Sequence, residues 1–110
     1  MTVAFELDRA PFVALNGGPQ FTFSEAISFA VNCETQADID RLWEKLSEGG
    51  EPGVCGWLKD RYGVSWQIVP SVLPKLLGGS DPKGAARAMQ AMLKMSKLDA
   101  GALQRAYDGV

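Results

Sequence analysis

Hydrophobic and polar residues alternate along two short stretches at the start of the chain, which is the pattern of strands with one buried face. Between Thr2 and Asp8 the bulky positions are every second residue, Val3, Phe5 and Leu7. Phe12 to Leu15 repeats the pattern and ends at the turn-forming run Asn16-Gly17-Gly18-Pro19. With a turn at Asp8-Arg9-Ala10-Pro11 between them, the two stretches predict a β-hairpin whose apolar face is buried.

The segment from Glu25 to Pro70 predicts one strand-helix-strand-strand module. Ala26 to Cys33 alternates, with Ile27, Phe29, Val31 and Cys33 on one face. Thr35 can cap a helix that carries Ile39, Leu42, Trp43 and Leu46 at helical spacing and ends at Gly49-Gly50. Val54 to Lys59 and Val64 to Val69 predict two more strands, joined by the turn Asp60-Arg61-Tyr62-Gly63.

After Pro70 the spacing becomes helical. Ser71 to Leu77 predicts a short helix, Asp81-Pro82 opens a longer one, and Asp99 starts a last one with Leu103 and Tyr107. We interpret the apolar stripe of the long helix as core packing rather than as a cofactor contact; its members are Ala85, Ala88, Met89, Met92 and Met95. Strands around one helix, followed by helices, indicate a single α+β domain over residues 1–110.

Composition narrows the range of partners. The 46% hydrophobic and 22% charged fractions are those of a globular protein, and the net charge of −2 with scattered basic residues argues against nucleic acid. No apolar run is long enough to span a bilayer, and the N-terminal segment is acidic, so we expect a cytoplasmic protein without membrane contact. Cys33 and Cys55 form no C-x-x-C pair, and we expect both to be reduced.

The absence of histidine excludes several kinds of active site, among them Ser-His-Asp and Cys-His catalysis and zinc sites that use histidine. Neither nucleotide-binding glycine motif is present, so we interpret the glycines between Gly49 and Gly56 as turn residues. Cys55 has no evident base near it in sequence, and we interpret it as a strand residue rather than a nucleophile.

The second face of the module's sheet is the candidate binding surface. If the bulky residues pack under the helix, the opposite face carries four polar and two small residues, Ser28, Asn32, Ser65, Gln67, Ala26 and Ala30. Such a face leaves room for a ligand, but periodicity alone slightly favours exposure to solvent or cover by another subunit. Trp57, on the preceding strand, either walls this surface or belongs to the core.

Three long stretches resemble a known family. They are Ala26 to Thr35 (AISFAVNCET), Trp43 to Gly50 (WEKLSEGG) and Cys55 to Pro70 (CGWLKDRYGVSWQIVP). They are similar to the PhnB-like branch of the vicinal oxygen chelate superfamily, which has the glyoxalase/bleomycin-resistance fold and is labelled as a 3-demethylubiquinone-9 3-methyltransferase domain. The similarity extends to Phe5-Glu6-Leu7-Asp8, to Ala14 to Pro19 and to the Met-rich tail.

The resemblance implies two βαβββ modules around a shared cavity, in a homodimer. Residues 25–70 would be the second module, residues 1–19 the closing hairpin of an incomplete first module, and residues 71–110 a helical tail. Either the chain is truncated, or two chains exchange strands and complete each other's sheets.

The resemblance also implies a position for a divalent metal ion. Gln67 falls where family members carry a last-strand glutamate ligand, and the corresponding strands offer only Ala26 and approximately Asn16. Two carboxamides make a poor metal site, so we expect neither a metal nor another cofactor. No glycine-rich turn for S-adenosylmethionine is present either.

Three hypotheses follow. The first is a protein of unestablished activity that binds a small molecule through Gln67, Ser28, Asn16 and Trp57. The second is an enzyme, either of the glyoxalase/dioxygenase type or a methyltransferase, completed by a partner chain. The third is an interaction module whose concave face is filled by its dimer partner.

Overall fold

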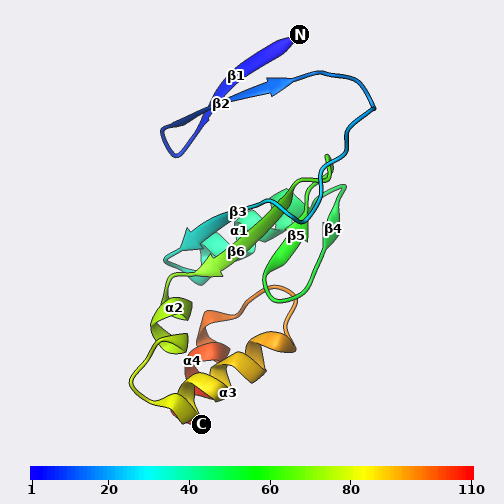
Figure 1. Ribbon diagram of the computed structural model, residues 1–110. Coiled ribbons are helices and arrows are strands. Elements are labelled where there is room, and N and C mark those ends of the chain that lie inside the picture. Colours follow the sequence, from blue (N-terminus) through cyan, green and yellow to red (C-terminus); the bar gives the residue numbers. More distant parts are fainter.

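The computed structural model describes all residues from Met1 to Val110 and shows an α+β protein with two sheets and four helices. Figure 1 shows the hairpin set apart from the larger sheet, with the C-terminal helices at the opposite end of the molecule. The strands are β1 (Thr2–Leu7), β2 (Ala10–Leu15), β3 (Ser28–Cys33), β4 (Glu51–Pro52), β5 (Trp57–Lys59) and β6 (Ser65–Pro70). The helices are α1 (Gln36–Ser47), α2 (Val72–Leu77), α3 (Pro82–Leu93) and α4 (Ala100–Asp108).

The hairpin of β1 and β2 forms where the alternation predicts it, but its turn is shorter. Asp8 and Arg9 alone make the turn, both with positive φ (48° and 69°), and Ala10 already pairs with Leu7. Two positive φ values in a two-residue loop match the right-handed twist of the strands. The second strand therefore begins at Ala10 rather than at Phe12.

The apolar face of this hairpin is not buried, contrary to the expectation from the alternation. Every residue of β1 is exposed, including Phe5 at 41%. Phe5 stacks on Phe12 with 5.6 Å between ring centroids, and Phe12 meets Phe29 of β3 edge to face at 5.7 Å. The alternation of residues shows which face of a strand is apolar. Burial of that face requires another layer packed on it, and no layer of this chain packs on the hairpin.

The second sheet has the strand order β3-β6-β5-β4, with β3 parallel to β6 and the other pairs antiparallel. Two strands begin later than expected, and β6 is shifted by one residue, from Val64–Val69 to Ser65–Pro70. β3 begins at Ser28, and Ile27 before it is 75% exposed. Val54 to Gly56 form a turn rather than strand, because Cys55 and Gly56 both have positive φ and the N–H of Trp57 bonds back to Val54 O at 3.0 Å. The short β4 precedes that turn, where the sequence predicts only a loop.

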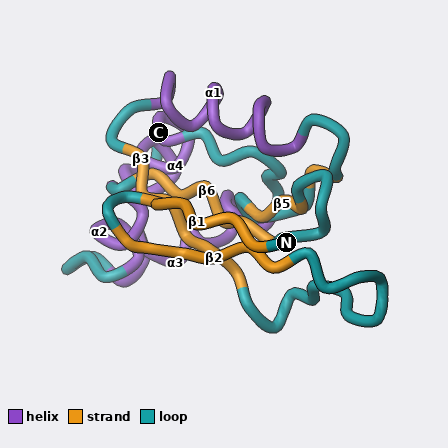
Figure 2. Tube along the Cα trace, turned by 90° about the horizontal axis from the view of Figure 1, so that it is seen from above, coloured by secondary structure: helices purple, strands orange, loops and turns teal.

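One hydrophobic cluster lies between this sheet and α1. The hydroxyl of Thr35 accepts from the N–H of Asp38 at 3.1 Å, as expected for the helix cap, and Gly49 follows the helix with φ of 76°. Ile39 of α1 packs with Cys33, Leu58 and Ile68 of the sheet. Figure 2 shows α1 along one side of β3 and β6, so the helix covers a single face of the sheet.

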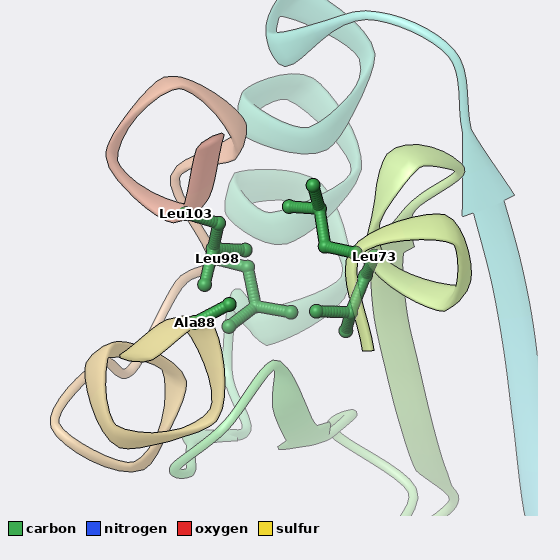
Figure 3. Close-up of a cluster of buried hydrophobic side chains, with 5 residues drawn as sticks. Leu73, Ala88, Leu98 and Leu103 are labelled. Atoms are coloured by element: carbon green, nitrogen blue, oxygen red, sulfur yellow. The ribbon is translucent and has the colours of Figure 1, made fainter. Parts of the chain in front are cut away.

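The helices α2, α3 and α4 form a second cluster (Figure 3). It consists of Leu73, Leu76, Ala88, Leu98 and Leu103, with Met92 and Met95 packed against it. The predicted core role of the α3 stripe is confirmed for these residues but wrong for Met89, which is 38% exposed. The buried side of α3 is centred on Gly84 and Ala88, because those small residues admit the side chain of Tyr107 and the rest of α4.

Polar contacts fix the tail against the module. The side chain of Gln36 in α1 donates to Leu98 O at 3.0 Å and accepts from the N–H of Ala100 at 2.9 Å. On the other side, Cys55 N–H donates to Met95 O and Gly56 N–H to Ser96 O, each at 2.8 Å. The two clusters therefore belong to one folded unit.

Both cysteines are free thiols, and Cys33 is buried while Cys55 is partly exposed. Burial raises the pKa of the Cys33 thiol. None of the four helices combines the length and the apolar character needed to cross a bilayer.

Candidate functional site: an open sheet face and a pocket at its edge

The sheet face opposite α1 is called here the open face, and it is defined by Ser28, Ala30, Asn32, Trp57 and Gln67. The pairing register places Ala30 and Trp57 on either side of Gln67, and directly paired residues point to the same face of a sheet. Ala30 and Asn32 are exposed, and Ser28, Trp57 and Gln67 are half-buried. The sequence interpretation of this face as small and partly polar is confirmed for Ser28, Ala30, Asn32 and Gln67. Trp57, which the sequence left open, lies on this face beside Gln67.

Gln67 is held in place from the neighbouring strand. Its Nε2 donates to Ser28 Oγ at 2.9 Å, diagonally across β6 and β3. This bond fixes the amide and leaves its oxygen, Oε1, available as an acceptor. Trp57 lies directly opposite Gln67 on β5, so the structure brings three of the four predicted ligand-binding residues together.

Asn16, the fourth predicted residue, lies elsewhere. It follows β2, where its backbone N–H donates to Met1 O at 3.0 Å. Figure 1 shows this end of the hairpin, marked by the N-terminus, well away from β5 and β6. Within one chain, Asn16 does not join the other three residues by any hydrogen bond.

Ser65 is on the same face as Gln67 but is not open to solvent. It is 2% exposed, and its hydroxyl has no hydrogen-bond partner in the protein. It lies at the edge of a pocket of about 290 Å³, called here the connector pocket because residues 22–27, between β2 and β3, form much of its wall. The lining residues are Thr22, Phe23, Ser24, Ala26, Ile27, Phe29, Val64 and Ser65.

An ion pair between Glu25 and Lys59 fastens this connector to β5. The hydrogen bond from Lys59 and the nearby positive charge lower the pKa of Glu25, and the same pairing raises the pKa of Lys59. Sequence reasoning missed this contact, because Glu25 and Lys59 are brought together only by the path of the chain over the sheet.

A second hollow, of about 330 Å³, has no hydrophobic residue in its lining and lies beside the turn between β5 and β6. It is lined by Gly49, Gly50, Glu51, Lys59, Asp60, Arg61 and Gly63. Gln67 lines neither of these two hollows.

The donor atoms around Gln67 do not suit the divalent metal ion that the superfamily resemblance implies. Gln67 and Ser28 offer one amide oxygen and one hydroxyl, and Ala26 offers no donor atom in its side chain. No group of three His, Cys, Asp or Glu residues lies close enough to hold a metal ion. Divalent ions of this kind prefer carboxylate, imidazole or thiolate ligands, so the residues present do not fit the group.

Comparison with known proteins identifies the family. Residues 1–69 match the family model described as 3-demethylubiquinone-9 3-methyltransferase. The chain belongs to this family. The match covers the hairpin and the module up to β6, and the resemblance to PhnB-like proteins seen in the sequence is confirmed.

Two solved structures are similar to this PhnB-like chain. The PhnB protein from Bacillus cereus, which bears the same 3-demethylubiquinone-9 3-methyltransferase label, is 32% identical over 64% of this chain, with a TM-score of 0.60. Protein PA1353 from Pseudomonas aeruginosa shares the fold at 20% identity, over 64% of this chain and 62% of its own, with a TM-score of 0.52. The chain spans 64% of the length of the Bacillus protein. No protein with a curated description matches the chain.

Proposed function

We propose that this PhnB-like protein binds a small molecule on the open face, with Gln67 as its principal hydrogen-bonding group. The observation that carries the proposal is the bond from Gln67 to Ser28, which holds an amide in one orientation on the sheet face opposite α1. Trp57 beside it supplies an aromatic surface, and exposed Ala30 leaves space for a ligand. Such convergence of a few polar groups with apolar surface is typical of ligand sites.

The proposal includes a homodimer in the glyoxalase/bleomycin-resistance arrangement. The hairpin has an exposed apolar face and unpaired strand edges, and β3 is an edge strand of the second sheet. Exposed edges of this kind pair readily with another chain. In such a dimer we propose that Asn16 of one chain joins the open face of the other, because within a single chain Asn16 has no hydrogen bond to Gln67, Ser28 or Trp57.

The test is a fragment screen by NMR, with neutral and anionic single-ring compounds, on the isotopically labelled protein. We expect the compounds that bind to shift the signals of Ala30, Gln67 and the Trp57 indole in a saturable way. Gln67→Ala should weaken binding roughly tenfold, because it removes a hydrogen bond at a partly desolvated site. Gln90→Ala, at an exposed position on α3, is the matched control and should bind as the wild type does.

Two further measurements separate the alternatives. A stoichiometric divalent ion in the purified protein that is lost in Gln67→Ala would contradict the metal-free site. Because the family is named for a methyl transfer, S-adenosylmethionine is also titrated into the labelled protein. Saturable shifts of the NMR signals at the open face would favour the enzyme hypothesis instead.

A further inference from the structure

The two polar atoms of the Gln67 amide have different surroundings. Its Nε2 donates to Ser28 Oγ at 2.9 Å, whereas no group of the protein donates to its Oε1. The half-buried and buried residues of this chain have one buried side-chain nitrogen or oxygen without a hydrogen-bond partner, and that atom is Ser65 Oγ. Because Oε1 of half-buried Gln67 also lacks a partner and is not such an atom, it is accessible to solvent. The oxygen is therefore both unpartnered and within reach of a ligand.

From this asymmetry we infer that the open face binds a neutral, flat aromatic compound that donates a hydrogen bond to Gln67 Oε1, through a ring N–H or a phenolic O–H. Ser28 is a positioning residue for this contact, because it holds the amide with its oxygen free. The inference rests on the proposed binding function and specifies the ligand of that same site.

The free oxygen determines the polar group of the ligand. A ligand that donates to Oε1 keeps the bond between Gln67 and Ser28 and adds a second one to the amide. A ligand that only accepts would cover Oε1 without pairing it. An unpaired polar atom costs free energy once water is removed from it, so the site favours a donor.

The neighbours of Gln67 favour a flat ring. Ala30 and Trp57 are directly paired with Gln67 on either side, so the three side chains lie on one face of the sheet. Ala30 is exposed and ends in a methyl group, and Trp57 is half-buried. A ring placed over Ala30 would lie within reach of both the amide and the indole, and contacts between aromatic rings are favourable beyond the area that they bury.

The charges around the open face favour a neutral ligand. None of the five residues that define this face is ionisable at neutral pH. Lys59, two residues after Trp57 on β5, is already paired with Glu25. A charged ligand would lose hydration here without gaining a counter-charge.

The experiment compares three fused-ring compounds of nearly the same shape. Indole donates through its N–H, benzofuran has no donor, and benzoxazole has no donor but carries an acceptor nitrogen. Each is titrated into the full chain while NMR follows the amide signals of Ala30 and Gln67 and the side-chain N–H of Trp57. We expect all three to bind, and indole to bind roughly 5- to 10-fold more tightly than the other two because of one added hydrogen bond.

Two substitutions at Gln67 separate the role of its oxygen from that of its nitrogen. Gln67→Glu keeps an acceptor but has no N–H, and it should retain the preference for indole. Gln67→Ala removes both groups and should bind the three compounds with equal affinity. Gln90→Ala, at an exposed position on α3, is the control and should retain the wild-type preference.

Ser28→Ala tests the positioning role. The released amide can turn and offer either of its ends, so the preference for indole should fall to roughly twofold while the affinity for benzofuran stays unchanged. A merely structural role of Ser28 would instead lower the affinity for all three compounds alike.

Equal affinities in the wild type would overturn the inference about the ligand and leave binding at the open face intact. A preference for benzoxazole, or a preference for indole that survives Gln67→Ala or is lost in Gln67→Glu, would overturn it as well. Absence of saturable shifts at the open face with every compound, those of the fragment screen included, would contradict the proposed function itself and the inference with it.

Discussion

Asp60 accepts three hydrogen bonds in the turn between β5 and β6. Its Oδ1 accepts from the N–H groups of Tyr62 at 2.9 Å and Val64 at 3.0 Å, and its Oδ2 accepts from the indole N–H of Trp66 at 3.0 Å. One carboxylate therefore fixes both the turn and the ring that packs against Phe29, with 5.2 Å between ring centroids.

We expect Asp60→Ala to lower the free energy of unfolding by about 2–4 kcal/mol, because two backbone N–H groups and a partly buried indole lose a charged acceptor. Asp60→Asn should cost less, since one carbonyl oxygen remains for the turn. Urea denaturation followed by circular dichroism measures both. A loss of equal size in the two variants would show that the charge, rather than the turn geometry, is what stabilises the segment.

The ion pair of Glu25 and Lys59 predicts a pH dependence of the connector. The pKa of Glu25 is lowered from its ordinary 4.5, first by the hydrogen bond from Lys59. The stabilisation of the folded connector by Glu25 is therefore complete above pH 4.5 and is lost as the pH falls through the lowered pKa. The pKa of Lys59 is raised from 10.5, first by the hydrogen bond to Glu25. The stabilisation of the folded connector by Lys59 is therefore complete below pH 10.5 and is lost as the pH rises through the raised pKa.

Between those limits, Glu25→Gln should speed amide hydrogen exchange in residues 20–27 relative to the wild type. Below the lowered pKa of Glu25 the two proteins should exchange alike, because the wild-type carboxylate is then protonated. Glu44→Gln removes a charge from an exposed position on α1 and is the control. Equal exchange of the wild type and Glu25→Gln at neutral pH would show that the ion pair does not restrain the connector.

At the scale of elements, Leu98 is the contact through which the tail joins the module. It is fully buried within the cluster of α2, α3 and α4, and a Cβ added at Gly56 would lie 2.9 Å from its side chain. The loop from α3 to α4 therefore packs directly on the turn before β5, which explains why that turn requires glycine.

Leu98→Ala should lower the free energy of unfolding by about 2–5 kcal/mol, because it opens a cavity in a small core. Leu93→Ala, at a position of α3 that is 54% exposed, should change it by less than about 0.5 kcal/mol. Urea denaturation of both variants measures the difference. Similar small losses would indicate that the tail is only loosely attached to the sheet.

At the scale of the whole molecule, the chain is more extended than its size requires. Its radius of gyration is 16.1 Å, against about 13 Å for a compact domain of this length. Its accessible surface of 7625 Å² exceeds by about 1,700 Å² what a compact monomer of this mass exposes, whereas a standard interface buries about 800 Å² on each partner. An isolated two-stranded hairpin is at best marginally stable in water, so the surplus at β1 and β2 favours cover by a second copy.

Light scattering should accordingly give twice the chain mass of 11.9 kDa. Val3→Lys places a charge on the apolar face of β1 and should shift the equilibrium to the monomer, because the charge would have to be buried at the interface. Val110→Lys, at the exposed C-terminus, should leave the mass unchanged. A monomeric wild type at all concentrations tested would contradict the dimer.

Local patterns in the sequence determined much of the fold. The cap at Thr35, the helical spacing of α1 and the alternation in β3 and β6 act over a few residues, and these elements formed as predicted with small shifts at their ends. The α+β class and the tail of three helices follow from the same short-range rules. The family, too, could be named from continuous stretches of sequence.

Only the tertiary structure decided what covers each face. Alternation places Ser65 and Gln67 on one side of β6, but the connector buries the first and leaves the second partly open. The alternation also identifies the apolar face of the hairpin, yet no layer of this chain covers that face. Burial and partnership depend on segments distant in sequence, such as Glu25 and Lys59 or Met95 and Cys55, and short-range periodicity contains no information about which of them meet.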